Sequence, residues 1–194
     1  MDTKANIIDC SYSLFLSSSY KTVTIKDICK EIGLTKGALY YHFTSKEEIF
    51  KQVVDRYFVM HKPLTVSKNT TFACLIKNSL INIEDTLELL FKGKPDFTTV
   101  NYMSFICDVY RYYPSFAEQK KYWLKLELEK IKSVLDNAIL NGEIRGDMDT
   151  RLVAINYLSI IVGMTSNVIY DGFKEFSLEI LQKQLDTFYK TLKS

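Results

Sequence analysis

Hydrophobic residues recur every three or four positions along most of this 194-residue chain, and they nowhere alternate with polar residues as a half-buried strand requires. This spacing places apolar side chains on one face of a helix. Capping residues, glycines and prolines divide the pattern into about nine amphipathic segments. The sequence therefore predicts an all-α protein with helices over residues 3–18, 25–32, 36–43, 45–61, 72–91, 96 or 98 to 113, 115–140, 150–170 and 174–192.

Residues 24–50 carry the densest set of helix-end signals in the chain. Thr24 is placed as an N-cap, and Gly33 supplies the left-handed residue that ends the helix begun there. Thr35 caps the next short helix, and Ser45 opens a capping box for the third. Because the connection between the first two helices is only a few residues long, this stretch predicts a helix-turn-helix.

The second helix of this motif has a polar outer face. Leu39 and Phe43 stand four residues apart, so both face the core. The remaining side chains offer hydrogen-bonding and cationic groups suited to phosphates and base edges, and Gly37 permits a close approach of the helix to another surface. Two simpler interpretations stay open, because the tyrosines could be packing residues and the histidine and lysine could be ordinary surface residues. The candidates are Thr35, Lys36, Gly37, Tyr40, Tyr41, His42 and Lys46.

This stretch resembles the DNA-binding domain of the TetR family of one-component transcriptional regulators, whose pattern is T-I-x-D-I-x-x-x-x-G-[LV]-[ST]-x-G-x-L-Y-x-H-F-x-[ST]-K-[ED]-x-[LI]. The resemblance is detailed over residues 3–60, whereas the rest of the chain agrees in helix number and length, with a weak GxIRxDxD echo at 142–149. The matching residues are Thr24, Ile25, Asp27, Ile28, Gly33, Leu34, Thr35, Gly37, Leu39, Tyr40, His42, Phe43, Ser45, Lys46, Glu47 and Ile49.

The resemblance implies a DNA-binding domain over residues 1–46 and a larger ligand-binding and dimerisation domain over 47–194, connected by the helix at 45–61. It implies a homodimer that binds double-stranded DNA at a palindromic operator and responds to a small-molecule effector. The chain departs from the family at the end of the first helix, where Ser19 replaces a common glycine, and a left-handed Ser19 would cost on the order of 1 kcal/mol. The implied DNA contacts are Thr24, Thr35, Lys36, Gly37, Tyr40, Tyr41, His42 and Lys46.

The segment from Phe91 to Trp123 is rich in aromatic residues. Such residues at helical spacing are core residues more often than ligand contacts, but buried tyrosines need hydrogen-bond partners, which a polar-lined pocket provides. Asp108 stands in an apolar run and either faces solvent or faces inward, where it would favour a cationic ligand. The candidate ligand-binding residues are Tyr102, Met103, Phe105, Asp108, Tyr112, Trp123, Met164 and Asn167.

The last two predicted helices carry wide apolar surfaces. Ser159, Gly163 and Asn167 add a stripe of small or polar residues that permits another helix to approach closely. The family resemblance implies that this helix pair forms a four-helix bundle with its copy in a second subunit; the alternative is that these faces pack within one chain. The candidate interface residues are Ile155, Leu158, Ser159, Ile161, Val162, Gly163, Leu181, Leu185 and Phe188.

Composition adds little support for a nucleic-acid partner, because the formal net charge is only +2. The four cysteines have no CxxC spacing and no partner histidines, so no metal site is expected. No secretory signal and no apolar run of about 20 residues is present, so a cytoplasmic protein is expected. No catalytic constellation and no glycine-rich phosphate loop is found, and no cofactor is expected.

The favoured function is therefore a ligand-responsive, sequence-specific DNA-binding regulator. It is expected to be a repressor that a small apolar or aromatic effector releases from a palindromic operator. The alternative is a helical small-molecule-binding protein without operator binding, and an enzyme built on a helical bundle comes third. The polar residues of the second motif helix separate the first two, because a carrier has no need of Lys36, Gly37, Tyr41 and Lys46 together.

Overall fold

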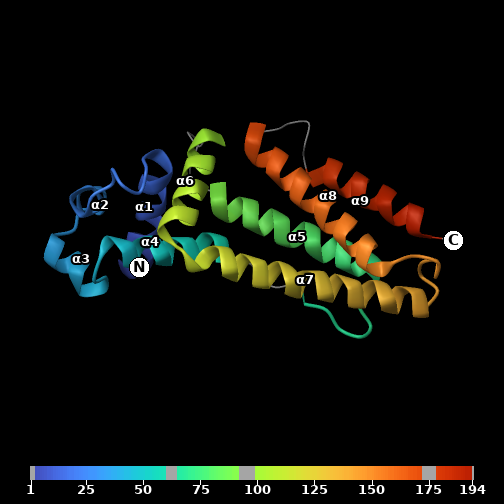
Figure 1. Cartoon of the computed structure of the whole chain (residues 1–194). Helices are drawn as coiled ribbons and strands as arrows, with labels where there is room; N and C mark the ends of the chain where they lie inside the picture. The colour runs from blue at the N-terminus through green and yellow to red at the C-terminus, as the bar shows by residue number, and fades with distance from the viewer. Residues whose placement is uncertain (1–2, 60–64, 92–98, 172–177, 194) are drawn as a thin grey trace. The chain divides into compact units, whose positions relative to one another are not determined.

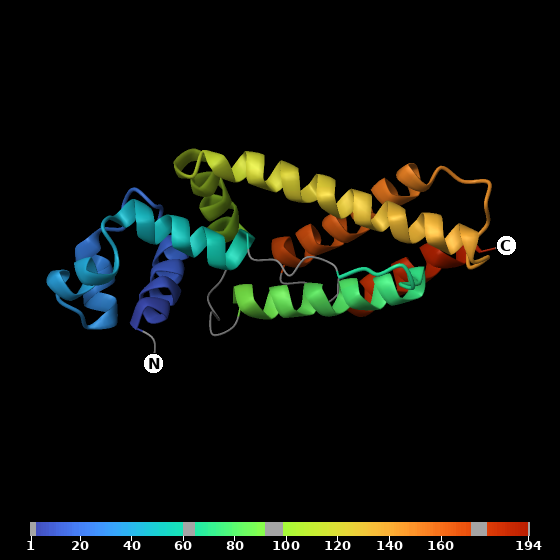
Figure 2. The same cartoon turned by 90° about the horizontal axis from the view of Figure 1, so that it is seen from below.

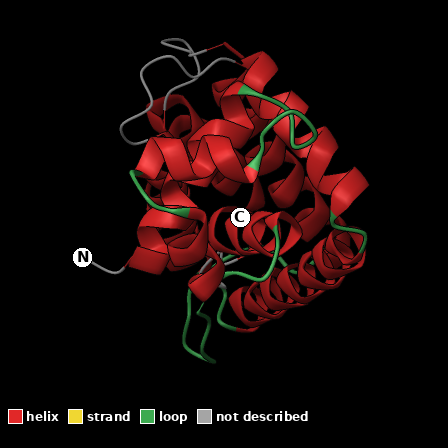
Figure 3. Ribbon diagram, turned by 90° about the vertical axis from the view of Figure 1, so that its left-hand side faces the viewer, coloured by secondary structure: helices red, strands yellow, loops and turns green. Residues whose placement is uncertain are grey.

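The computed structural model describes residues 3–59, 65–91, 99–171 and 178–193. Within these ranges the chain forms nine α-helices and one π-helix and contains no strand (Figure 3). The predicted all-α class is therefore confirmed. The chain divides into two compact units: unit 1 comprises Met1–His61 with Leu90–Glu118, and unit 2 comprises Lys62–Leu89 with Gln119–Ser194.

Unit 1 is built on the first four helices and the sixth (Figure 1). Helix α1 packs against α2, α4 and α6, so it is the central helix of this unit. A short π-helix, η1, directly continues α4. The elements are α1 (Thr3–Ser17), α2 (Ile25–Ile32), α3 (Lys36–His42), α4 (Lys46–Val54), η1 (Asp55–Val59) and α6 (Thr99–Tyr112).

The core of unit 1 is strongly aromatic. The rings of Tyr12 and Tyr57 stack with centroids 3.7 Å apart, and Phe105 of α6 meets Tyr12 edge-on at 5.6 Å. Phe15 and Phe50 meet edge-on at 5.2 Å and join α1 to α4. Because α2 and α3 are too short to bury much surface themselves, this core is what holds the helix-turn-helix in place.

Unit 2 contains the remaining helices, of which α8 and α9 run side by side (Figures 1 and 2). Its core collects buried residues from all four helices. Glu143 organises one end of this unit: its carboxylate accepts the N–H groups of Phe72 and Ala73 at 3.0 and 3.1 Å and the hydroxyl of Tyr189 at 2.7 Å. The helices are α5 (Phe72–Phe91), α7 (Ser115–Leu140), α8 (Thr150–Asp171) and α9 (Leu178–Leu192).

The helix ends differ from the expectations in a few places. The helix expected over 45–61 is α-helical only to Val54 and continues as η1 to Val59, beyond which residues 60 and 61 lie outside the described ranges. The expected beginnings of two helices, at 96 or 98 and at 174, also fall outside those ranges. Ser19 does not adopt the left-handed conformation, because no described residue other than glycine has a positive φ.

None of the helices in the described part of the chain combines the length and the apolar character that crossing a membrane requires.

Candidate nucleic-acid interface

Helix α2 begins and ends through contacts within its own sequence. The Thr24 hydroxyl accepts the N–H of Asp27 at 3.2 Å, and the Asp27 carboxylate accepts the N–H of Thr24 at 2.9 Å. The Thr24 hydroxyl also donates to the Asp27 carboxylate at 2.7 Å, and this bond, followed by that from the Thr24 N–H, holds the pKa of Asp27 below its ordinary value. Gly33 has φ 73°, and the N–H of Leu34 returns to the carbonyl of Cys29 at 2.9 Å. The predicted N-cap and left-handed end are both confirmed.

Helix α3 follows two residues after this turn. The Thr35 hydroxyl accepts the N–H of Ala38 at 3.2 Å and so caps the helix as predicted. Leu39 is 0% exposed and Phe43 is 1% exposed, so the apolar side of α3 faces the core of unit 1. The opposite side of α3 is thereby left to solvent.

Most candidate DNA contacts lie on that exposed side. Lys36 and Gly37 are exposed at the first turn, Tyr40 is 50% exposed, and Tyr41 is 86% exposed. His42 is half-buried, and its ring lies edge-on to that of Tyr41 with centroids 5.1 Å apart. Apart from this contact with His42, the Tyr41 side chain buries little surface against the described residues. Lys36, Gly37, Tyr40 and Tyr41 are thus all exposed on α3, with His42 half-buried beside them.

Gly37 has open space around the position of a missing Cβ. The nearest atom that an added Cβ would meet, apart from the helix's own backbone, is the Thr35 hydroxyl oxygen at 4.0 Å. Glycine within a helix is less favourable than alanine by roughly 0.5–1 kcal/mol. The described part of the fold therefore does not require glycine at this position.

The third capping site is arranged differently from the prediction. The Ser45 hydroxyl accepts the N–H of Glu48 at 3.1 Å, which is the expected N-cap of α4. The Glu48 carboxylate, however, accepts the N–H and the hydroxyl of Thr44, both at 2.7 Å, rather than the N–H of Ser45. The reciprocal bond of the capping box therefore reaches one residue further back.

Lys46 is placed differently from the other candidates. Its ammonium donates to the carbonyl of Tyr20 at 2.7 Å and to that of Val23 at 2.8 Å, and it lies 4.4 Å from the centroid of the Tyr20 ring. Burial lowers the pKa of this ammonium. Two of its three N–H bonds are donated to backbone carbonyls of the protein. Lys46 is therefore not the freely exposed cation that the sequence suggests.

Several of the candidate ligand-binding residues are packed within the core of their own unit. In unit 1, Phe105 is fully buried in the aromatic core, and Asp108 is buried with its carboxylate on the N–H of Tyr20 at 2.7 Å. The interpretation that Asp108 faces solvent is therefore wrong, whereas the alternative, that it faces inward, agrees with the structure. The ring of Tyr112 packs against that of Tyr20, with centroids 4.7 Å apart. Tyr102 is half-buried on the same core, whereas Met103 is partly exposed.

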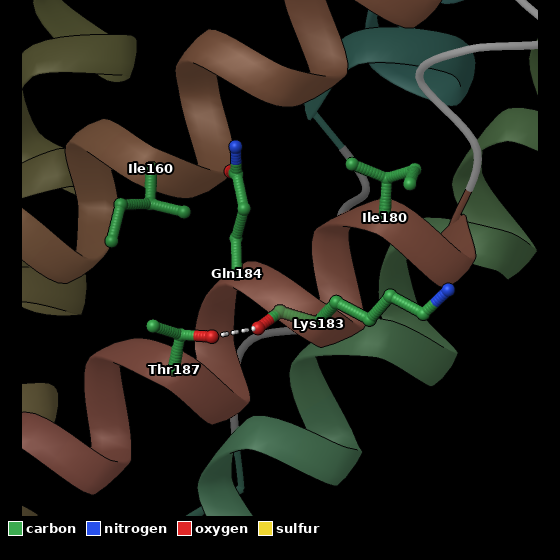
Figure 4. Close-up of a pocket in the computed structure, with 5 residues that line it drawn as sticks. All are labelled: Ile160, Ile180, Lys183, Gln184 and Thr187. Atoms are coloured by element: carbon green, nitrogen blue, oxygen red, sulfur yellow. Dashed lines mark hydrogen bonds between the residues drawn. The ribbon is translucent and has the colours of Figure 1, made fainter.

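In unit 2, Met164 is buried in the core and Trp123 is partly exposed. Asn167 belongs to α8, but its side chain lies outside the described ones. Two open grooves border α8: one of about 400 Å³ against α9, whose lining is drawn in Figure 4, and one of about 680 Å³ against α7. None of the eight candidates lines either groove, so these grooves do not support the predicted set as a ligand site.

The candidate dimer residues separate into exposed and buried sets. Leu181 and Leu185 are buried in the core of unit 2, so their assignment to an intersubunit surface is wrong. The stripe of α9 faces inward because it meets α8 and the loop of Glu143 within the same chain. Leu158, Ile161 and Phe188 are partly buried against that core, whereas Ile155, Ser159, Val162 and Gly163 are exposed on α8.

Residues 7–53, which lie within the segment from α1 to α4, match the sequence model of the family described as bacterial regulatory proteins, tetR family. This N-terminal segment is thus similar to the TetR family. The match supports the expectation that the chain is a regulator and not an enzyme.

Curated relatives match a limited part of this chain. The biofilm operon icaADBC HTH-type negative transcriptional regulator IcaR of Staphylococcus epidermidis is 40% identical over 55 residues, which cover 28% of this chain and 30% of that protein. IcaR of Staphylococcus aureus (strain Newman) is 43% identical over 51 residues, which cover 26% of this chain and 27% of that protein. The matched segment thus spans less than a third of the length of these relatives.

Solved structures are similar to the chain over nearly its whole length. MexZ, a repressor responsible for antibiotic resistance in Pseudomonas aeruginosa, superposes with a TM-score of 0.67 at 16% identity and covers 100% of this chain and 96% of its own. NalD, the secondary repressor of the MexAB-OprM multidrug efflux pump of the same organism, gives 0.65 at 14% identity, covering 98% and 96%. At these identities the likeness concerns the fold alone.

Tyr20 is the residue of this region that sequence reasoning missed. Its backbone joins two charged side chains, one of them 88 residues away in the sequence. The aromatic residue that follows Ser19 was visible in the sequence, but no local signal pairs it with Asp108. Among the described residues, no three His, Cys, Asp or Glu side chains gather in a group that could hold a metal ion.

Proposed function

We propose that this protein is a ligand-responsive, sequence-specific transcriptional regulator that acts in the cytoplasm as a repressor. It binds a palindromic operator as a homodimer and leaves it when a small apolar or aromatic effector binds. The observation that carries this proposal is the division of α3 into two sides, with Leu39 and Phe43 buried and Lys36, Gly37, Tyr40 and Tyr41 exposed. Supporting it, the relatives that match over part of their length are named negative transcriptional regulators.

The exposed side of α3 suits the major groove of DNA. A helix-turn-helix places its second helix in that groove with the N-terminal residues against the base edges. Lys36 at the first turn can donate to guanine or to phosphate, and the Tyr40, Tyr41 and His42 side chains can hydrogen-bond to phosphates. Gly37 lets the backbone come close to the duplex, and Thr24 and Thr35 lie at the exposed N-termini of α2 and α3. A single helix of seven residues makes too few contacts for a unique site, which favours a dimer on a palindrome.

The dimer proposal now rests on α8. Ile155 and Val162 are large apolar residues that are exposed on α8, and the small residues Ser159 and Gly163, which are also exposed, permit close helix approach. The groove between α8 and α9 presents Ile160 and Ile180 beside the polar Gln184 and Thr187 (Figure 4). A mixed surface of this kind, continuous over both helices, is suited to a second copy of the pair. The buried leucines of α9 support that surface from within.

The proposed effector remains a small apolar or aromatic molecule, because aromatic side chains are dense along α6 and the first half of α7. The alternative function, a small-molecule-binding protein without operator binding, would leave the exposed residues of α3 without a role. Tyr41 is the most exposed large residue among those described on α3. The two functions differ in whether this side chain contacts DNA.

DNA binding is tested with the DNA upstream of the protein's own gene. We expect a gel-shift assay with this fragment to give a discrete complex that competitor DNA of unrelated sequence does not abolish. Footprinting of the complex should reveal two half-sites about one helical turn apart, at 10–10.5 base pairs or a multiple of it. The matched control is Tyr41→Ala, which should fold normally and lose the complex. A wild-type protein that binds this DNA no better than unrelated DNA would favour the carrier function.

A further inference from the structure

The turn between α1 and α2 is held from two sides by charged side chains. The N–H of Tyr20 donates to the Asp108 carboxylate of α6 at 2.7 Å, and the carbonyl of the same residue accepts the Lys46 ammonium of α4 at 2.7 Å. Lys46 also reaches the carbonyl of Val23 at 2.8 Å. Both backbone polar groups of one turn residue are thus bonded to charges from two different helices of unit 1.

The side chain of Tyr20 is held by the same two helices. Its ring lies 4.6 Å from that of Phe50 on α4 and 4.7 Å from that of Tyr112 on α6, measured between centroids. The Lys46 ammonium lies over its face at 4.4 Å. A second hydrogen bond ties α6 to this region, because Asn101 donates to the carbonyl of Leu16 at 2.9 Å. A displacement of α6 would therefore disturb the turn directly.

The chemistry of this contact favours positioning over stabilisation. Asp108 is 5% exposed and stands between the buried residues Phe105 and Val109 on α6. A buried carboxylate is unfavourable unless hydrogen bonds satisfy it, and charge-assisted bonds are among the strongest that a protein makes. The buried carboxylate of Asp108 is thus stabilised while the Tyr20 N–H donates to it, and it becomes energetically unfavourable when that donor moves away. Such a contact holds a turn in a defined position.

We propose that Asp108 and Lys46 are positioning residues that clamp the Tyr20 turn and thereby hold α2 and α3 in the orientation that binds DNA. Because Asp108 belongs to α6, the clamp connects α6 directly to the turn that precedes α2 and α3, in addition to any connection through α4. Lys46 then serves DNA binding from within the protein and not through a phosphate. This inference rests on the proposed function for its effect on operator binding, whereas the clamp itself can be tested without DNA.

Amide hydrogen exchange tests the clamp on the full-length protein. Peptides covering residues 17–24 should exchange at least about tenfold faster in Asp108→Ala and in Lys46→Met than in the wild type, since each variant loses a hydrogen bond to a charged group. Asp108→Asn keeps an acceptor oxygen and should restore much of the protection. Lys51→Ala is the matched control, because this lysine of α4 forms an exposed ion pair with Glu47 at 2.8 Å and no hydrogen bond from it to the Tyr20 turn is among the described contacts. Unchanged exchange in both Asp108→Ala and Lys46→Met would overturn the clamp.

Operator binding at several salt concentrations separates positioning from phosphate contact. A lysine that binds a phosphate releases a counterion, so its loss reduces the salt slope of the binding constant by about 0.9 for each contact. We expect Lys46→Met to weaken binding at least about tenfold while the salt slope stays at the wild-type value. Asp108→Ala should behave in the same way, and Lys51→Ala should match the wild type. A salt slope reduced by about one in Lys46→Met would overturn the positioning role of Lys46.

The two proposals fail in different ways. If the wild-type protein binds no operator, the proposed function fails, while the exchange of residues 17–24 still reports on the clamp. If the wild type binds and the exchange changes as expected, but Asp108→Ala and Lys46→Met bind as the wild type does, the turn is held for stability alone and the positioning role is overturned. Circular dichroism on each variant establishes that the helices are intact in every comparison.

Discussion

Helices α3 and α9 are both amphipathic, yet only one of them is used as its sequence predicts. The apolar residues of α3 are buried and its polar residues form the exposed face, as expected. The stripe of α9 was assigned to a second subunit, but Leu181 and Leu185 are buried within the core of their own unit. A periodic stripe thus identifies the side of a helix that is buried, but it does not identify the surface that covers it.

The two helices differ in how far apart in the sequence their stabilising contacts lie. The bonds that place α3 join Thr35 to Ala38 and Cys29 to Leu34, within a few residues. Helix α9 is placed by contacts such as Tyr189 with Glu143, which are 46 residues apart. Local bonds can be recognised from residue types at fixed spacing, whereas distant partners depend on how the whole unit packs.

The largest expected effect comes from breaking the buried side of α3. Leu39→Ala removes a fully buried side chain and should lower the free energy of unfolding by about 2–5 kcal/mol. Tyr41→Ala, on the opposite side of the same helix, should change it by less than about 0.5 kcal/mol. Urea unfolding followed by circular dichroism measures both. Similar losses for the two variants would mean that Tyr41 has a packing role, and the distinction between the two sides of α3 would not hold.

A second pair of substitutions examines unit 2 in the same manner. Leu185→Ala on α9 should lower the free energy of unfolding by about 2–5 kcal/mol at a fixed protein concentration, because its side chain is fully buried. Val162→Glu on α8 places a charge on a side chain that is 52% exposed, so the chain should stay folded. Sedimentation should then show a monomer for Val162→Glu where the wild type is a dimer. A dimer that survives this change would place the interface away from Val162.

These contrasts define how far the sequence alone reaches. The helix class, most helix ends and the exposed face of α3 could be predicted, because caps such as Thr24 and Gly33 act locally. The role of Asp108 could not, since its partner is a backbone N–H that lies 88 residues away. The inward orientation of the α9 stripe likewise arises from packing between distant segments. The aromatic residues of α6 were judged by composition, and burial of Phe105 in unit 1 shows the limit of that criterion.

A smaller effect separates folding from binding at one position of α3. Gly37→Ala should raise the free energy of unfolding by about 0.5–1 kcal/mol, because alanine favours the helix and, apart from its chain neighbours and the helix backbone, the added methyl group meets no described atom closer than 4.0 Å. The same methyl group should weaken operator binding by standing between the backbone and the duplex. Thermal unfolding and fluorescence anisotropy measure the two quantities. A variant that is more stable and binds equally well would remove Gly37 from the contact surface.

The smallest effect concerns the cap of α2 and its dependence on pH. The side-chain hydrogen bond from Thr24, followed by that from its backbone, lowers the pKa of Asp27 below its ordinary value of 3.8. A carboxyl group with a lowered pKa in the folded state contributes stability above its unfolded pKa and loses it as the pH falls through the folded value. Thr24→Val removes the hydroxyl but keeps the backbone N–H, so the pKa of Asp27 should move only part of the way back toward 3.8. An NMR titration of the Asp27 carboxyl carbon in both proteins measures this shift. The stability difference between them should be constant above about pH 5 and shrink below pH 4. If it were constant down to the lowest pH, the Thr24 hydroxyl would not be stabilising the ionised form of Asp27.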